Sequence, residues 1–171
     1  MVASAPRTRA HGGIGSVRGM SISTFSHVAI GVRDMDVALP FWRDVVGLRV
    51  SLDTIEEMPQ GNGKPAAQRR AVYMRWDDDP RSSFVVLDQQ LATETAGEPA
   101  RIFQMGLHHY GFWVDDVDPI RERVEAAGLP IVLNGSVGAD SVWWGEPPGD
   151  TIRSIIVQDP EGGYVQFDQR V

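Results

Sequence analysis

The sequence predicts an α+β protein built from two tandem βαβββ modules, which form a curved eight-stranded mixed sheet around a cleft. Three observations support this: a repeated strand opening, a repeated Gly-Leu pair after a predicted helix, and a repeated strand ending. All three recur in the same order, which indicates a duplication. Such repeats decide the architecture, because a module too small to bury its own sheet must pack against its copy.

The first opening runs from His27 to Asp36, and the second runs from His109 to Asp118. In both, a histidine begins an apolar run rich in β-forming residues, a valine follows five residues later, and Asp-x-Asp comes next. Apolar runs of this length bounded by turn residues are typical of strands. The Asp-x-Asp sequences are typical of helix starts, where a side-chain carboxylate accepts a free backbone N–H.

The first module is expected to contain a strand at 26–32, a helix at 37–46, and strands at 48–52, 70–76 and 83–88. The helix has a buried stripe formed by Ala38, Phe41, Trp42, Val45 and Val46. Asp34 or Asp36 is expected to cap it, and Pro40 falls near its first turn, where a missing N–H costs least. The stretch from Glu56 to Ala66 is polar and is expected to be a loop.

The second module repeats this order, with a strand at 108–114, a helix at 119–127, and strands near 130–134, 151–158 and 164–168. Pro119 at the first helical position, with Asp118 as the cap, predicts the helix start. The endings Phe84-Val-Val-Leu-Asp-Gln89 and Tyr164-Val-Gln-Phe-Asp-Gln169 close the two modules alike. The organisation predicted is a flexible leader at 1–21, a first module at 22–90, a connector at 91–105 and a second module at 106–171.

Composition narrows the function classes. A formal net charge of -7 argues against a general nucleic-acid binder, and no apolar run approaches the length needed to cross a bilayer. The chain has no cysteine, which removes disulfides and thiolate chemistry and fits a cytoplasmic location. Lys64, the only lysine, lies in a Gly-rich loop and is a poor candidate for catalysis.

The His-x4-Val-x-Asp openings, the Gly-Leu pairs and the ending Asp-Pro-Glu-Gly-Gly-Tyr-Val-Gln resemble the vicinal oxygen chelate superfamily. That superfamily includes glyoxalase I, extradiol dioxygenases, fosfomycin-resistance transferases, methylmalonyl-CoA epimerase and bleomycin-resistance proteins. The resemblance covers residues 24–170 and implies the paired-module fold. It does not determine the reaction, because one fold hosts many chemistries.

In metal-dependent members the ligands come from the first and last strands of the modules. The resemblance carries these roles to His27, His109 and Gln166, where the last position is normally a glutamate, while Val86 occupies the fourth position. Two histidines and one oxygen donor suit Fe(II) or Mn(II), and Zn, Ni or Co are further options. The amide at Gln166 removes one negative charge from this ligand set.

Strand alternation predicts which side chains face the cleft. Besides the three ligand candidates, the expected pocket residues are Ala29, Val86, Gly111, Trp113, Trp143, Trp144 and Tyr164. The tryptophans could stack on a planar ligand or belong to a core or interface. His108 is expected to face away from the cleft, and Asp168 is a conceivable replacement for the missing carboxylate whose position fits a sheet edge better.

Two main functions follow from the sequence. The first is a divalent-metal-dependent enzyme of extradiol-dioxygenase type, acting on a small oxygenated or aromatic substrate. The second is a metal-free binding protein of the drug-resistance type, which sequesters a planar molecule. A glyoxalase-type lyase or isomerase is a further alternative, disfavoured by Val86. In each case the expected partner is a small molecule, and the expected assembly is a homodimer.

Overall fold

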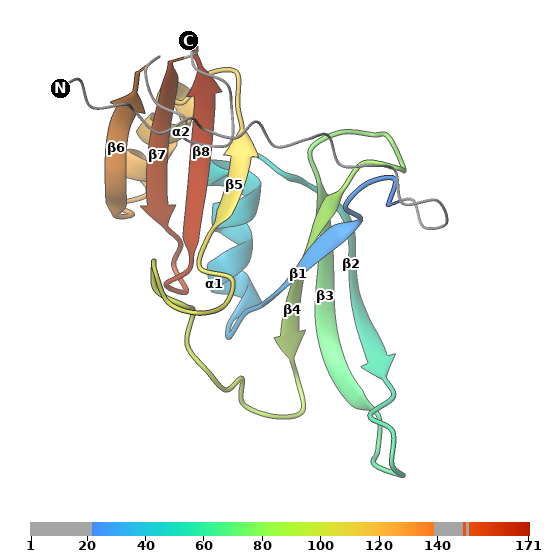
Figure 1. Ribbon diagram of the computed structural model, residues 1–171. Helices are drawn as coiled ribbons and strands as arrows, with labels where there is room; N and C mark the ends of the chain where they lie inside the picture. The colour runs from blue at the N-terminus through green and yellow to red at the C-terminus, as the bar shows by residue number, and fades with distance from the viewer. Residues whose placement is uncertain (1–21, 139–148, 150) are drawn as a thin grey trace, which may run out of the picture.

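The computed structural model describes residues 22–138, 149 and 151–171 (Figure 1). The predicted leader and the pocket candidates Trp143 and Trp144 lie outside these residues. No helix in the described part is long and apolar enough to cross a membrane. The strands are β1 (His27–Gly31), β2 (Arg49–Met58), β3 (Ala67–Arg75), β4 (Phe84–Gln90), β5 (Tyr110–Trp113), β6 (Ile131–Val137), β7 (Ile152–Gln158) and β8 (Tyr164–Arg170). The helical segments are α1 (Met35–Pro40), the π-helical turn η1 (Phe41–Val45) and α2 (Asp118–Ala126).

The strands form two four-stranded mixed sheets with matching topology. Their orders are β1-β4-β3-β2 and β5-β8-β7-β6. In each sheet the first and last strands of the module run parallel, and the remaining pairs are antiparallel. The α+β class and the two βαβββ modules are therefore confirmed. Among the described strands no pairing joins one sheet to the other, and β1 and β5 each remain at an edge.

The duplication is visible in the helix caps. The Asp34 carboxylate accepts the backbone N–H of Asp36 at 2.9 Å, and the Asp116 carboxylate accepts that of Asp118 at 3.0 Å. Asp118, predicted to be the cap, is instead the first residue of α2, and Val117 occupies the cap position. Both modules use the first aspartate of Asp-x-Asp to satisfy a donor that the helix leaves free.

The repeated strand endings also serve the helices. The side-chain oxygen of Gln89 accepts the N–H of Met35 at 3.1 Å, and that of Gln169 accepts the N–H of Val117 at 3.3 Å. Each glutamine thus ties the last strand of its module to the start of that module's helix. The same contact at two equivalent positions supports the duplication inferred from the sequence.

The first helix begins two residues earlier than predicted and changes character midway. Pro40 therefore lies in its second turn, not its first. Because proline has no N–H, it cannot bond to the preceding turn. The wider turn η1 follows directly, with the Val46 N–H donating to the carbonyl of Phe41 at 3.0 Å, five residues back.

The strand β2 is far longer than predicted and extends to Met58. Charged residues made this stretch look like a loop, but they pair with the neighbouring strand. Arg69 binds Glu56 at 2.8 Å, and Arg70 binds Asp53 at 2.8 Å. Cross-strand pairs of opposite charge stabilise a sheet even where the hydrophobic pattern is weak.

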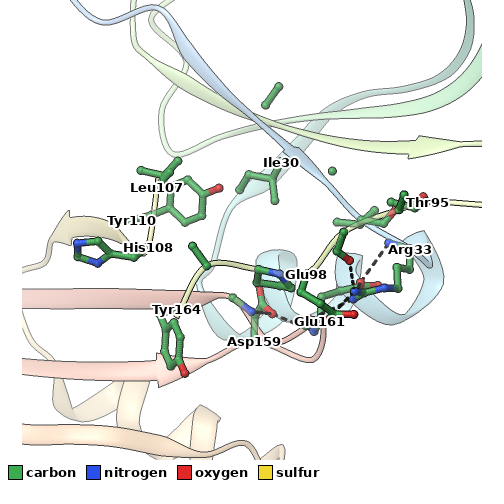
Figure 2. A pocket seen from close by; sticks show the side chains of 18 residues that line it. Ile30, Arg33, Thr95, Glu98, Leu107, His108, Tyr110, Asp159, Glu161 and Tyr164 are labelled. Atoms are coloured by element: carbon green, nitrogen blue, oxygen red, sulfur yellow. Dashed lines mark hydrogen bonds and ion pairs between the residues drawn. The ribbon is translucent and has the colours of Figure 1, made fainter. Parts of the chain in front are cut away.

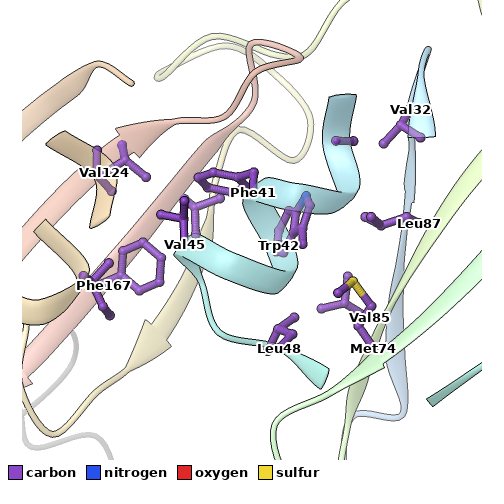
Figure 3. Packing of buried hydrophobic residues seen from close by; sticks show 14 of the residues in the cluster. Val32, Phe41, Trp42, Val45, Leu48, Met74, Val85, Leu87, Val124 and Phe167 are labelled. Atoms are coloured by element: carbon purple, nitrogen blue, oxygen red, sulfur yellow. The ribbon is translucent and has the colours of Figure 1, made fainter. Parts of the chain in front are cut away.

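One hydrophobic core serves both modules (Figure 3). Phe41 and Trp42 lie between the two sheets and are almost completely buried. The Trp42 ring packs edge-on against Tyr110 at 6.0 Å and Phe112 at 6.5 Å, both from β5. These two side chains of the first module therefore fill the space beside the second.

We expect Trp42→Ala to lower the free energy of unfolding by about 3–5 kcal/mol, because it opens a large cavity in the shared core. Urea denaturation followed by circular dichroism measures this change. Phe103→Ala is the matched control: Phe103 is 95% exposed, so its loss should cost less than about 0.5 kcal/mol. Equal effects of the two substitutions would contradict this account of the core.

Candidate functional site

The helices cover one face of each sheet and leave the other face for a site. The shared core takes alternate residues of the strands, among them Val85, Leu87, Val165 and Phe167. The intervening residues point to the opposite face, because successive side chains on a strand alternate. The predicted site residues on these strands belong to that second set.

The larger of two cavities between the modules has a volume of about 620 Å³. Its walls are mostly apolar and come from both modules. The first module contributes aromatic side chains that include Phe25, Trp76 and Phe84, and the second contributes His109, Phe112 and Trp113. Trp76 and Phe112 meet edge-on across the modules, with 6.1 Å between their ring centroids. A cavity of this size and lining suits a small planar molecule.

The smaller cavity, of about 260 Å³, is lined by both polar and apolar residues (Figure 2). Its charged residues bind one another. Arg33 pairs with Glu98 at 2.9 Å and with Glu161 at 3.4 Å. The Glu161 carboxylate also accepts the backbone N–H groups of Arg33 at 3.1 Å and Asp34 at 3.0 Å. Glu161 belongs to the turn before β8, so these contacts clamp the second module onto the start of α1.

His27 lies at the start of β1 and packs onto aromatic neighbours. Its ring stacks on Phe84, with centroids 5.0 Å apart and an interplanar angle of 14°. Its Nδ1 lies 3.1 Å from the hydroxyl oxygen of Ser26. The guanidinium of Arg75 lies over the same Phe84 ring at 4.6 Å. His27 is thus part of an aromatic and cationic stack on the first sheet.

His109 lies immediately before β5 and lines the larger cavity. Its Nδ1 is 2.8 Å from Nδ1 of His108, so one ring nitrogen must carry a proton and the other must accept it. Burial, followed by the nearby charge of His108, lowers the pKa of His109, and Asp168 partly offsets the shift. His108, expected to face away, instead contacts His109 and lines the smaller cavity.

Gln166 is buried in β8 and is held by Asp168. Its amide nitrogen donates to both carboxylate oxygens of Asp168 at 3.0 Å. Only the NH₂ end of the amide can face a carboxylate, so Oε1 is the atom available to a ligand. Val86, at the equivalent position of β4, is also buried and offers no donor.

The donors near the two predicted histidine ligands fit a resident Fe(II) or Mn(II) ion poorly. Within residues 22–138, 149 and 151–171, no three His, Cys, Asp or Glu side chains gather into a group that could hold a metal. The two imidazoles therefore have no acidic third ligand in this part of the chain. A set of two imidazoles and one amide has no negative charge, whereas these ions favour oxygen donors that include a carboxylate.

Four of the predicted pocket residues line one of the two cavities, whereas Val86 and the predicted ligands His27 and Gln166 line neither. Gly111 and Trp113 line the larger one, whereas Ala29 and Tyr164 line the smaller one. Sequence reasoning missed the first-module wall of the larger cavity. Phe84 was detectable, because it occupies the place of Tyr164 in the repeated strand ending. Trp76 follows the end of β3, and no sequence signal placed it beside β5.

The lowered pKa of His109 predicts a pH-dependent stability. The unfolded chain holds the His109 proton more tightly than the folded chain does, so stability decreases as pH falls below the ordinary value of 6.5. Between about pH 7.5 and about pH 5, wild type should therefore lose more unfolding free energy than His109→Gln. Urea denaturation at both pH values measures the difference. An equal loss in both proteins, or a His109 resonance titrating above 6.5 by NMR, would contradict it.

Solved structures with the same fold support the architecture. A glyoxalase family protein from Bacillus cereus aligns with 91% of this chain and 99% of its own, at 18% identity and a TM-score of 0.70. A lactoylglutathione lyase from Agrobacterium tumefaciens aligns with 87% of this chain and 95% of its own, at 23% identity and a TM-score of 0.52. Glyoxalase I from Leishmania major aligns with 84% of both chains, at 17% identity and a TM-score of 0.55. At these identities the likeness establishes the fold alone.

No curated protein matches the sequence significantly. A family model does: residues 26–142, more than half of the chain, match the Glyoxalase/Bleomycin resistance protein/Dioxygenase superfamily. The match spans all the described elements of the first module and the β5-α2-β6 part of the second. It agrees with the repeated openings at His27 and His109 and with the two βαβββ modules. The chain therefore belongs to the Glyoxalase/Bleomycin resistance protein/Dioxygenase superfamily.

Proposed function

We propose that this chain binds a planar, largely apolar small molecule in the larger cavity between its modules, without needing a metal ion to hold it. The observation that carries the proposal is the cavity of about 620 Å³ with aromatic walls from both modules. Aromatic rings pack well against planar ligands, and burying apolar surface supplies most of the binding free energy. This corresponds to the drug-resistance type of superfamily member.

The position of His109 suits it to orient such a ligand. It lines the mostly apolar cavity, and its lowered pKa keeps the imidazole uncharged near neutral pH. A neutral imidazole can donate or accept one hydrogen bond without the cost of burying a charge. One polar contact in an apolar cavity fixes orientation, and the aromatic walls provide the affinity. We also propose that the chain forms a homodimer and is located in the cytoplasm. The proposed binding in the cavity requires neither property.

We expect Trp76→Ala to weaken binding of a planar probe such as 2-methoxynaphthalene by roughly three- to tenfold, because it removes one aromatic wall. Equilibrium dialysis in EDTA measures the dissociation constant without relying on tryptophan emission. Phe103→Ala, which removes an exposed ring outside both cavities, should leave it unchanged. Failure of wild type to bind any of a panel of planar aromatic probes would refute the proposed function.

The second candidate is a divalent-metal-dependent enzyme of extradiol-dioxygenase type that uses His27, His109 and Gln166. Two observations favour it: the Gln166 amide turns its NH₂ toward Asp168 and leaves Oε1 for a ligand, and the pKa of His109 favours the neutral imidazole that metals require. A glyoxalase-type lyase or isomerase would need these ligands and a fourth one at the position of Val86, which offers no donor. Two of the similar solved structures are a lactoylglutathione lyase and a glyoxalase I, which is the support for this alternative.

This second candidate makes a sharp prediction about metal content. After anaerobic reconstitution with Fe(II) or Mn(II), the chain should retain one ion, and both His27→Ala and His109→Ala should lose it, because each removes one of only three donors. Elemental analysis measures the content. His108→Ala is the matched control and should retain the ion. Wild type that loses its metal on gel filtration would eliminate this candidate.

A further inference from the structure

The smaller cavity has a buried carboxyl group in its wall. Asp159 follows β7, lines this cavity and is only 8% exposed (Figure 2). Burial raises the pKa of this carboxyl group, and the backbone N–H groups of the turn that follows offset only part of the shift. The fold therefore leaves the negative charge of Asp159 partly uncompensated. A buried charge in that state is stabilised by a cation that binds beside it.

Asp159 is the exception among the charged residues of this wall, because none of the described cations forms an ion pair with it. Among the described wall residues, Arg33 is the one with a permanent positive charge. Its guanidinium is already bound by Glu98 at 2.9 Å and Glu161 at 3.4 Å. It also donates to the carbonyl of Gly97 at 2.6 Å. The cavity therefore has three carboxyl groups for one guanidinium, and the charge of Asp159 is the one left over.

The turn at 159–163 explains one oxygen of Asp159 but not its charge. Oδ1 accepts the backbone N–H groups of Glu161 at 2.9 Å and Gly163 at 2.8 Å. The neutral amide oxygen of an asparagine could accept the same two hydrogen bonds. The other oxygen, Oδ2, lies beside Gly163, where an added Cβ would approach it to 2.8 Å. Gly163 also lines the cavity, and its lack of a side chain keeps Oδ2 uncovered on that side.

Tyr110 provides a second polar atom in the wall of the same cavity. Its ring packs edge-on against Trp42, and its hydroxyl makes no hydrogen bond to any described residue. Burial, followed by the nearby charge of Asp159, raises the pKa of Tyr110. The hydroxyl therefore stays protonated at neutral pH and lies within reach of the field of Asp159. Its oxygen can accept a hydrogen bond from a group that also binds the carboxylate.

We propose that the smaller cavity binds a small alkylammonium ion, with its charged end at Asp159 and Tyr110. The apolar part of the ion packs against aliphatic wall residues, which include Ile30, Pro99 and Leu107. The ammonium N–H groups donate to the carboxylate and phenol oxygens, and the positive charge offsets the cost of the buried carboxylate. A volume of about 260 Å³ admits only a small molecule. This binding is separate from that of the planar ligand and does not rest on it.

Cyclohexylamine and cyclohexanol test this binding, because they have the same shape and differ in charge at neutral pH. We expect wild type to bind the amine about tenfold more tightly than the alcohol, from the charge-assisted hydrogen bond to the carboxylate. Isothermal titration calorimetry at neutral pH measures both dissociation constants. Asp159→Asn keeps an acceptor oxygen for the turn and removes the charge, so it should abolish most of the preference for the amine.

Glu122→Gln is the matched control, because it removes an exposed negative charge outside both cavities, and it should leave the preference intact. Equal affinity of wild type for the two probes would overturn the proposed site, and so would a preference that survives Asp159→Asn. If the melting curve shows that Asp159→Asn does not fold, Tyr110→Phe replaces it. This variant keeps the ring against Trp42 and should reduce the preference about threefold, whereas an unchanged preference would overturn the site. Neither probe is planar, so these outcomes leave the proposal for the larger cavity standing.

Discussion

The packing of Phe41 and Trp42 between the two sheets is the constraint on which the rest of the structure depends. Each module has one short helical segment and four strands, which is too little to bury a sheet alone. The shared core solves this, because the first helix fills space beside both sheets and Trp42 contacts β5 directly. The Glu161 carboxylate of the second module also accepts two backbone N–H groups just before α1, and this contact helps to hold the modules together.

This packing also explains where a ligand can bind. The side chains of Tyr110 and Phe112 turn toward Trp42, and the edge strands β1 and β5 stay unpaired with each other. The space along β5 becomes the larger cavity, whose walls come from both modules. The modules differ on the sheet face that points away from the helices. The first has an Arg69–Asp88 ion pair there, and the second has Ser154. In each module one buried oxygen on this face has no hydrogen-bond partner among the described residues, Asp88 Oδ1 in the first and the Ser154 hydroxyl in the second.

The fold was well predicted from the sequence because each informative pattern occurs twice, once in each module. In both modules the first aspartate of the Asp-x-Asp opening accepts a backbone N–H at the start of the helix. In both, the glutamine of the Asp-Gln ending also accepts a backbone N–H there and so joins the last strand to the helix. The predicted length of β2 was wrong, because the charged residues of this strand pair with the neighbouring strand and show no apolar pattern. The site was predictable only along strands, where alternation places Gly111 and Trp113. The contact of Trp76 with Phe112 depends on how strands of the two modules meet, which residue spacing does not encode.

The central claim is that a ligand binds between the modules, in contact with both. Indole N–H resonances of Trp76, Trp113 and Trp42 report on this directly in a ¹H–¹⁵N NMR titration with 2-naphthol. Trp76 and Trp113 line the cavity from opposite modules, and Trp42 is buried in the core. The account predicts that the Trp76 and Trp113 signals shift together with one saturation curve and that Trp42 shifts least. A shift confined to one module, or none at either tryptophan, would contradict it.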